Sequence, residues 1–206
     1  MQRDVAAPPA LETPARPRSG LIAAWGPTLG MRNAEDAGMG RRLARTVAVA
    51  NIPEAVFAHL DDQTRLAEHM EKPSAMMGGG RMTYRFDAGR GQAVGSHIQM
   101  GGSAFGVTMS VDEVVTERTP PSHKVWRTEG PVRLLIIGRY AMGFDIAPSP
   151  EGSQLTVWID YDLPRGPFGW LALPLAAFYA RWCVGRMARD AVDHFRGRPA
   201  PVASAA

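Results

Sequence analysis

The segment from Gly166 to Phe195 constrains the fold most, because it carries the longest helical periodicity in the chain. It opens with the uncharged run GPFGWLALPLAAFYA and continues as the charged amphipathic sequence RWCVGRMARDAVDHFR. On a helix of about 3.6 residues per turn, one apolar stripe contains Leu173, Ala177, Val184, Met187, Ala191 and Phe195. A second apolar face, roughly opposite, contains Leu171, Leu175, Phe178 and Trp182. We expect the stripe to pack on a sheet and the second face to cover a cavity, a second subunit or a lipid surface.

Upstream of this helix, apolar and polar residues alternate with a period of two, which is typical of strands that bury one face. The pattern predicts about seven strands, at residues 43–50, 81–87, 97–100, 105–111, 124–128, 140–146 and 155–161. The last two should form a hairpin around the turn PSPEGS.

Two short helices are predicted directly after the first strand. Asn51 is a favourable N-cap residue and Pro53 suits the first turn, so a helix should run from there through Leu60. A second short helix should cover residues 64–70. The resulting order predicts an α+β fold, in which a curved antiparallel sheet of about seven strands wraps around the long C-terminal helix.

The two ends of the chain differ from this pattern. Residues 1–40 should form a mostly disordered arm, because MQRDVAAPPALETPARPRSG is rich in Pro and Ala and has almost no large apolar residue. The folded domain is expected at residues 41–196, and residues 197–206 should be a flexible tail.

Composition argues against several classes of protein. Lys and Arg number 23 and Asp and Glu 20, which is too slight an excess to favour nucleic-acid binding. Cys183 is the only cysteine, so the chain has no internal disulfide and a reduced, cytoplasmic setting is expected. The longest uncharged apolar run contains Pro167 and Pro174 and is shorter than the roughly 20 residues that a membrane-spanning helix needs. No transmembrane segment is therefore expected.

The sequence also lacks the usual signatures of catalysis. It contains no GxSxG elbow, P-loop, GxGxxG or HExxH motif. Its five histidines show no ligand spacing: His59, His69, His97, His123 and His194. We therefore predict no catalytic constellation, no metal site and no cofactor. His97 and Gln99 should face solvent, and Arg45 should lie at a strand edge in water.

Three segments carry a resemblance to a known family. They are NIPEAVFAHLDD after the first strand, VDEVVTERTPPSHKVWRT across a Pro-Pro turn, and LTVWIDYDLPRGPFGW before the last helix. Over about residues 41–196 the chain resembles the SRPBCC superfamily of START-like and birch-allergen-like proteins, in particular its polyketide cyclase/dehydrase and lipid-transport group. The resemblance implies a helix-grip fold with a deep apolar cavity between the sheet and the long helix. Members of the superfamily include carriers, sensors and a minority of enzymes.

Residues on the apolar strand faces and on the second helix face are candidates to line such a cavity. They are Tyr84, Phe86, Phe105, Met109, Tyr140, Met142, Phe144, Tyr161, Leu175, Phe178 and Trp182. The three tyrosines among them would each place a hydroxyl group among apolar side chains.

The preferred interpretation is a single domain that binds a hydrophobic or amphipathic small molecule, lipid-like or polyketide-like, in an internal cavity. An alternative from another class is a cyclase or dehydratase that acts on a polyketide-like substrate. A third is an interaction protein, which would use the front of the last helix to meet a membrane surface or to form a homodimer. Whether any reaction is catalysed stays open at this point.

Overall fold

A computed structural model of the chain describes residues 40–65, 82–104, 106–164 and 172–197. Nearly all of the predicted arm at 1–40 and of the predicted tail at 197–206 therefore lies outside the described residues, as do Phe105 and Leu171. The described residues all belong to one compact unit, 33–206.

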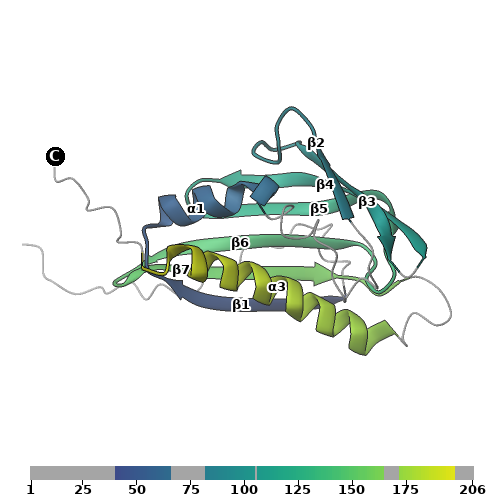
Figure 1. The fold of residues 1–206 in the computed structure, drawn as a ribbon. Helices are drawn as coiled ribbons and strands as arrows, with labels where there is room; N and C mark the ends of the chain where they lie inside the picture. The colour runs from purple at the N-terminus through teal and green to yellow at the C-terminus, as the bar shows by residue number, and fades with distance from the viewer. Residues whose placement is uncertain (1–39, 66–81, 105, 165–171, 198–206) are drawn as a thin grey trace, which may run out of the picture. The chain divides into compact units, whose positions relative to one another are not determined.

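Seven antiparallel strands form one curved sheet in the order β1-β7-β6-β5-β4-β3-β2 (Figure 1). Their bounds are β1 Arg41–Val49, β2 Met82–Phe86, β3 His97–Ala104, β4 Val107–Thr119, β5 His123–Arg133, β6 Tyr140–Ser149 and β7 Gly152–Tyr161. Every predicted strand is present, most of them longer than predicted. The predicted hairpin is β6 and β7, whose ladder ends at Ser149 opposite Gly152. Gly152 has φ +130° and a Cβ there would lie 2.5 Å from the carbonyl oxygen of Val49, so this turn requires glycine.

The helix after the first strand is α1, Pro53–Asp61. Its N-cap is Ile52 and not the predicted Asn51, whose side-chain oxygen instead accepts a hydrogen bond of 2.9 Å from the Ile52 amide. Pro53 occupies the first turn as predicted, because the amide that it lacks has no partner inside a helix there. Residues 63–65 begin another helical turn, and the rest of the helix predicted at 64–70 is not described.

The long C-terminal helix is α3, Leu173–Phe195, and it packs beside β1 and β7, at the opposite side of the sheet from β2 (Figure 1). Its buried positions are Ala176, Ala180, Val184, Gly185, Met187, Ala188, Ala191 and Phe195. The predicted stripe is therefore right from Val184 onward. In the first turns of the helix, the buried residues are Ala176 and Ala180. The predicted Leu173 and Ala177 are only half-buried there. Small side chains at these positions let the helix backbone approach the sheet closely.

The face of the sheet that carries Val115, Trp126 and Phe144 is its inner face, because these residues share the main core with α1 and α3. Helix α1 covers part of this face, and Phe57 packs edge-on against Phe144 with ring centroids 5.5 Å apart. A small apolar cluster lies on the opposite, outer face and is centred on Trp158. The guanidinium of Arg42 lies 4.4 Å above the Trp158 ring.

Gly143 on β6 is required by this tryptophan. A Cβ at Gly143 would lie 2.6 Å from the Trp158 ring and 2.7 Å from the carbonyl oxygen of Lys124. We expect Gly143→Ala to lower the free energy of unfolding by about 1–3 kcal/mol, because an added methyl group here overpacks the sheet. Urea denaturation followed by circular dichroism measures the change.

Gly101 on β3 is the matched control for this substitution. A Cβ there would meet its nearest atom, the hydroxyl oxygen of Thr83, at 4.0 Å. Gly101→Ala removes the same unfolded-chain entropy without the clash, so it should leave the urea midpoint unchanged or raise it. Equal midpoints for the two variants would contradict this account of Gly143.

Candidate functional site

A buried carboxyl group lies on the inner face of β4. Glu113 is 6% exposed and continues the alternation that buries Met109, Val111 and Val115. The strand predicted at 105–111 ends at Val111, so Glu113 was not among the predicted site residues. One further step of the same period would have placed an acidic side chain on an apolar face, which is the signal that identifies it.

Two neutral donors hold the Glu113 carboxyl group. The Tyr140 hydroxyl on β6 donates to Glu113 Oε1, and the indole of Trp126 on β5 forms a second hydrogen bond to the same carboxyl group. The backbone of Tyr140 is fixed in turn, because its amide donates to the Thr128 hydroxyl at 3.2 Å. Neighbouring strands of the sheet thus place these groups around one carboxyl group.

The environment changes the proton affinity of the Glu113–Tyr140 pair. Burial raises the pKa of Glu113 to about 7, and the hydrogen bonds from Tyr140 and Trp126 only partly oppose it. Burial, followed by the charge of Glu113, raises the pKa of Tyr140 well above its ordinary value. Glu113 therefore changes its charge near neutral pH, whereas Tyr140 keeps its proton.

Helix α3 faces the same carboxyl group with two further polar side chains. The charge of Glu113 contributes to the raised pKa of both Tyr179 and Cys183, so the two helix residues lie within its electrostatic reach. Burial raises the pKa of Cys183 to about 12, although a hydrogen bond with Tyr179 opposes this. The pKa of Tyr179 is raised by the adjacent Cys183 first and by burial second. Both groups are neutral at physiological pH.

The side chains around the Glu113–Tyr140 pair are incompletely packed. Five of them face inward yet are only half-buried: Tyr84, Met100, Met142, Tyr179 and Cys183. Met109 forms a small cluster with Tyr84, Met100 and Leu134, and the last two of these also pack against the main core. Inner-face residues of β2, β3 and β6 and two residues of α3 therefore keep accessible apolar surface next to a buried carboxyl group.

Residues 41–197 match the family described as polyketide cyclase/dehydrase and lipid transport. The chain belongs to this family. No curated protein is similar enough to match it. The predicted membership of the SRPBCC superfamily and its helix-grip fold are thereby confirmed.

Solved structures share the fold of this family member at low identity. Ara h 8.0201 is 10% identical, with 77% of this chain and 99% of that chain covered and a TM-score of 0.52. A protein from Rhizobium leguminosarum is 13% identical, with coverages of 77% and 95% and a TM-score of 0.50. Major latex-like protein 151 from Panax ginseng is 14% identical, with coverages of 77% and 98% and a TM-score of 0.46. At such identities the first two similarities show the fold alone.

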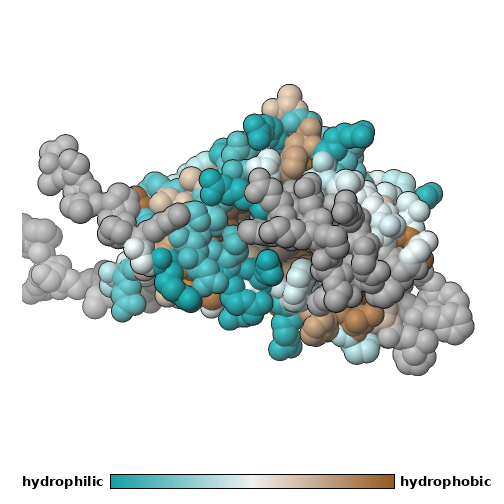
Figure 2. Space-filling view, viewed as in Figure 1, coloured by the Kyte–Doolittle hydropathy of each residue, from teal (hydrophilic) through white to brown (hydrophobic). Residues whose placement is uncertain are grey.

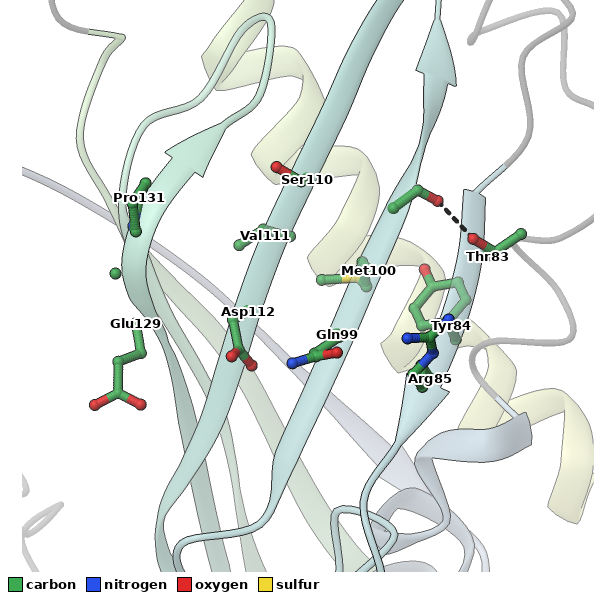
Figure 3. Close-up of a pocket in the computed structure, with 12 residues that line it drawn as sticks. Thr83, Tyr84, Arg85, Gln99, Met100, Ser110, Val111, Asp112, Glu129 and Pro131 are labelled. Atoms are coloured by element: carbon green, nitrogen blue, oxygen red, sulfur yellow. Dashed lines mark hydrogen bonds between the residues drawn. The ribbon is translucent and has the colours of Figure 1, made fainter.

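The family member has a polar hollow of about 530 Å³ on the outer face of β2–β5 (Figure 3). It lies where β5 departs from regular pairing with β4 around Gly130, which has φ +66°. Gln99, Asp112 and Glu129 line it, on the side of the strands away from α3 (Figure 3). Asp112 also pairs with His97, whose Nδ1 lies 3.2 Å from its carboxylate. As predicted, Gln99 is exposed, and the His97 side chain is 41% exposed.

A second hollow, of about 370 Å³, lies beside α1 between Phe57 and the Pro120–Pro121 turn. It borders a buried ionic cluster in which Lys124 Nζ and Arg118 Nη2 each lie 2.8 Å from an oxygen of Asp61. The two cations share one carboxylate, and this cluster ties α1 to β4 and β5. Neither hollow lies between the sheet and α3.

The predicted cavity residues occupy three different environments. Met109, Tyr140, Phe144 and Tyr161 are buried, and Tyr84, Phe86, Met142 and Trp182 are half-buried. Leu175 and Phe178 are 51% and 55% exposed, and Figure 2 shows hydrophobic surface over the first turns of α3. The structure brings Tyr84, Met109, Tyr140 and Met142 to the inner face around Glu113, whereas Phe144 packs into the main core. Arg45 is exposed on edge strand β1, as predicted.

Two further features bear on the chemistry. Within the part of the chain that the structure describes, no group of three or more His, Cys, Asp or Glu side chains is arranged to hold a metal ion. No described helix is long and apolar enough to cross a membrane.

Proposed function

We propose that this protein binds a hydrophobic or amphipathic small molecule, lipid-like or polyketide-like, between α3 and the inner face of β2–β6. The supporting observation is the set of half-buried, inward-facing side chains around the Glu113–Tyr140 pair. Ligand sites are mostly apolar and contain a few convergent polar groups, and this arrangement has both properties. Membership of the family supports the same class of ligand.

The energetics favour an apolar occupant. Part of the apolar surface on the inner face is accessible to solvent. It belongs to the half-buried side chains Tyr84, Met100 and Met142. Covering such surface contributes about 25 cal/mol per Å². Methionine side chains adjust to differently shaped apolar molecules, because their three torsions rotate freely. The outer hollow is a poorer site for such a ligand, because its lining combines apolar residues with four charged or amide side chains: Arg85, Gln99, Asp112 and Glu129.

Probe binding to two substitutions on β3 tests this proposal. Met100 packs with Met109 and Tyr84 of the inner face, although it also borders the outer hollow, and its neighbour Gln99 places an amide group in that hollow. We expect wild type to bind the neutral fluorescent probe N-phenyl-1-naphthylamine saturably, and Met100→Lys to weaken that binding tenfold or more by placing a charge in the site. Gln99→Lys adds the same charge to the other face and should leave probe affinity unchanged. A Met100→Lys protein that is folded and binds the probe like wild type would refute the proposed site.

The alternative of a cyclase or dehydratase needs a group that moves a proton to or from a substrate. Glu113 has a suitable pKa, but Tyr140, Tyr179 and Cys183 all have raised pKa values and stay protonated near neutral pH. The described site thus contains one titrating group where acid–base catalysis commonly uses two. This favours binding over turnover.

The exposed pair Leu175 and Phe178 remains the candidate contact for a second subunit or a membrane surface, and the proposed ligand site does not depend on it. A cytoplasmic location likewise remains a proposal, which the free thiol of Cys183 supports.

A further inference from the structure

We propose that Glu113 selects amphipathic ligands whose polar end is a basic nitrogen, an inference that rests on the ligand site proposed above. The ligand class would be a protonated amine attached to an alkyl or aromatic body. The apolar body would lie against Met100, Met109 and Tyr84, and the ammonium group would meet the carboxylate of Glu113.

The hydrogen bonds of Glu113 leave room for such a donor. A carboxylate offers about four lone-pair positions. Among the described residues, its hydrogen-bond partners are Tyr140 and Trp126, and both are neutral. An ionised Glu113 therefore has spare acceptor capacity and a charge that its hydrogen-bond partners do not cancel. A buried charge in this condition is stabilised most by an opposite charge with N–H donors, which an ammonium group supplies.

The charged and titratable groups around Glu113 leave it negative on ionisation. On its own strand, Asp112 adds a like charge from the outer face. From β5, the Lys124 ammonium acts on Glu113 at a distance and lowers its pKa. Lys124 lies 2.8 Å from the carboxylate of Asp61, which it shares with Arg118, so its charge is partly offset. Tyr140 on β6 and Tyr179 and Cys183 on α3 are neutral, because their pKa values are raised. Tyr84 on β2 contributes to the raised pKa values of Tyr140 and Tyr179.

Three ligands of equal chain length test the inference by displacing N-phenyl-1-naphthylamine from the full chain: octylamine, octanol and octanoate. At pH 8 we expect octylamine to bind at least tenfold more tightly than octanol, and octanoate to bind most weakly, because it meets a like charge. In Glu113→Gln, octylamine should lose this advantage and fall within about twofold of octanol. Asp112→Asn removes the neighbouring charge on the outer face and should keep the preference for the amine.

The pH dependence has a definite sign. Octylamine stays protonated in this range, whereas protonation of Glu113, whose pKa is about 7, removes its charge. Octylamine affinity should therefore fall about tenfold between pH 8 and pH 6, octanol affinity should stay constant, and octanoate affinity should rise. Tyr140→Phe removes a hydrogen bond that lowers the pKa of Glu113, so the midpoint of this change should move to higher pH. This second variant keeps the test decisive if Glu113→Gln does not fold.

The outcomes separate the inference from the proposed function. The inference is overturned, and the apolar site stands, if octanol displaces the probe but octylamine has no advantage in wild type. It is overturned likewise if folded Glu113→Gln keeps the octylamine advantage, or if Tyr140→Phe leaves the midpoint of the pH dependence unchanged. If wild type binds neither the probe nor any of the three ligands, the proposed function fails and the inference fails with it.

Discussion

Replacing Asp61 by alanine is expected to lower the free energy of unfolding by about 3–5 kcal/mol, because it leaves a buried lysine without its counter-charge. Lys124 is fully buried on the inner face of β5, and its ammonium donates to both the carboxylate and the backbone carbonyl of Asp61. Arg118 on β4 binds the same carboxylate through two nitrogens, at 3.1 and 2.8 Å. One side chain of α1 thus holds two cations of the sheet. Urea denaturation at pH 7 measures the loss.

Asp193→Ala is the control for this prediction. Asp193 is 61% exposed and pairs with Arg196 at 3.0 Å, so its removal tests an ion pair in water. We expect a change of at most about 1 kcal/mol. Similar losses for the two variants would mean that burial of the Asp61 cluster does not determine its contribution.

Acid should reduce the difference between wild type and Asp61→Ala. Burial alone would raise the pKa of Asp61, but the hydrogen bonds from Arg118 and Lys124 outweigh it and hold the pKa below its usual value. The stabilisation is therefore fully present above the unfolded pKa of about 3.9 and is lost as the pH falls through the lower folded pKa. Denaturation at pH 7 and at pH 3 tests the sign.

Val184→Asp should abolish folding, with an expected loss of several kcal/mol, enough to exceed the stability of a typical domain of this size. Val184 is fully buried at the middle of α3, in the core that the helix forms with the sheet. An aspartate there would be an unpaired charge in an apolar contact, and it would also remove two methyl groups. Circular dichroism and the width of amide proton shifts report whether the chain folds.

Arg186→Asp is the control for this prediction. Arg186 is two residues further along α3 and is exposed, so this variant introduces the same aspartate side chain at the surface. Away from buried contacts a surface substitution usually changes stability by about 0.5 kcal/mol or less, so this variant should fold. A folded Val184→Asp protein with wild-type stability would show that α3 does not pack through this stripe.

Local sequence determined the elements of this fold. The period-two pattern around Tyr84, Phe144 and Val157 identifies strands, because alternation decides which side chains one face of a strand presents. The 3.6-residue pattern after Leu173 identifies the closing helix for the same kind of reason. Such periodicities depend on residues that are neighbours in the chain, so they are visible without any tertiary contact. The same periodicities also predicted which side chains of most strands face inward.

Local sequence did not determine where α1 begins or which face of α3 is buried in its first turns. Asn51 is the better N-cap residue by chemistry, yet the helix starts one residue later, because Asn51 is buried against Ser153 of β7 and its backbone carbonyl accepts the Ser153 hydroxyl at 2.6 Å. At the front of α3, Ala176 and Ala180 are buried in place of Leu173 and Ala177. The rotation of a helix on a sheet depends on the fit between two surfaces, which no single segment encodes.

Tertiary structure determined most of the candidate site, because it brings together side chains that are far apart in the sequence. Alternation along β4 places Glu113 on the inner face, but its partner Tyr140 is 27 residues away in sequence, and Tyr179 and Cys183 come from α3. Likewise, Lys124 and Asp61 are 63 residues apart and meet only because α1 packs on the inner face of the sheet. Proton affinity depends on burial and on charges that long-range packing brings together. The sequence by itself therefore determined the strands, the long helix and the apolar faces of the strands. Only the tertiary structure determined which polar groups share a buried site, because contacts between distant segments set their hydration and charge.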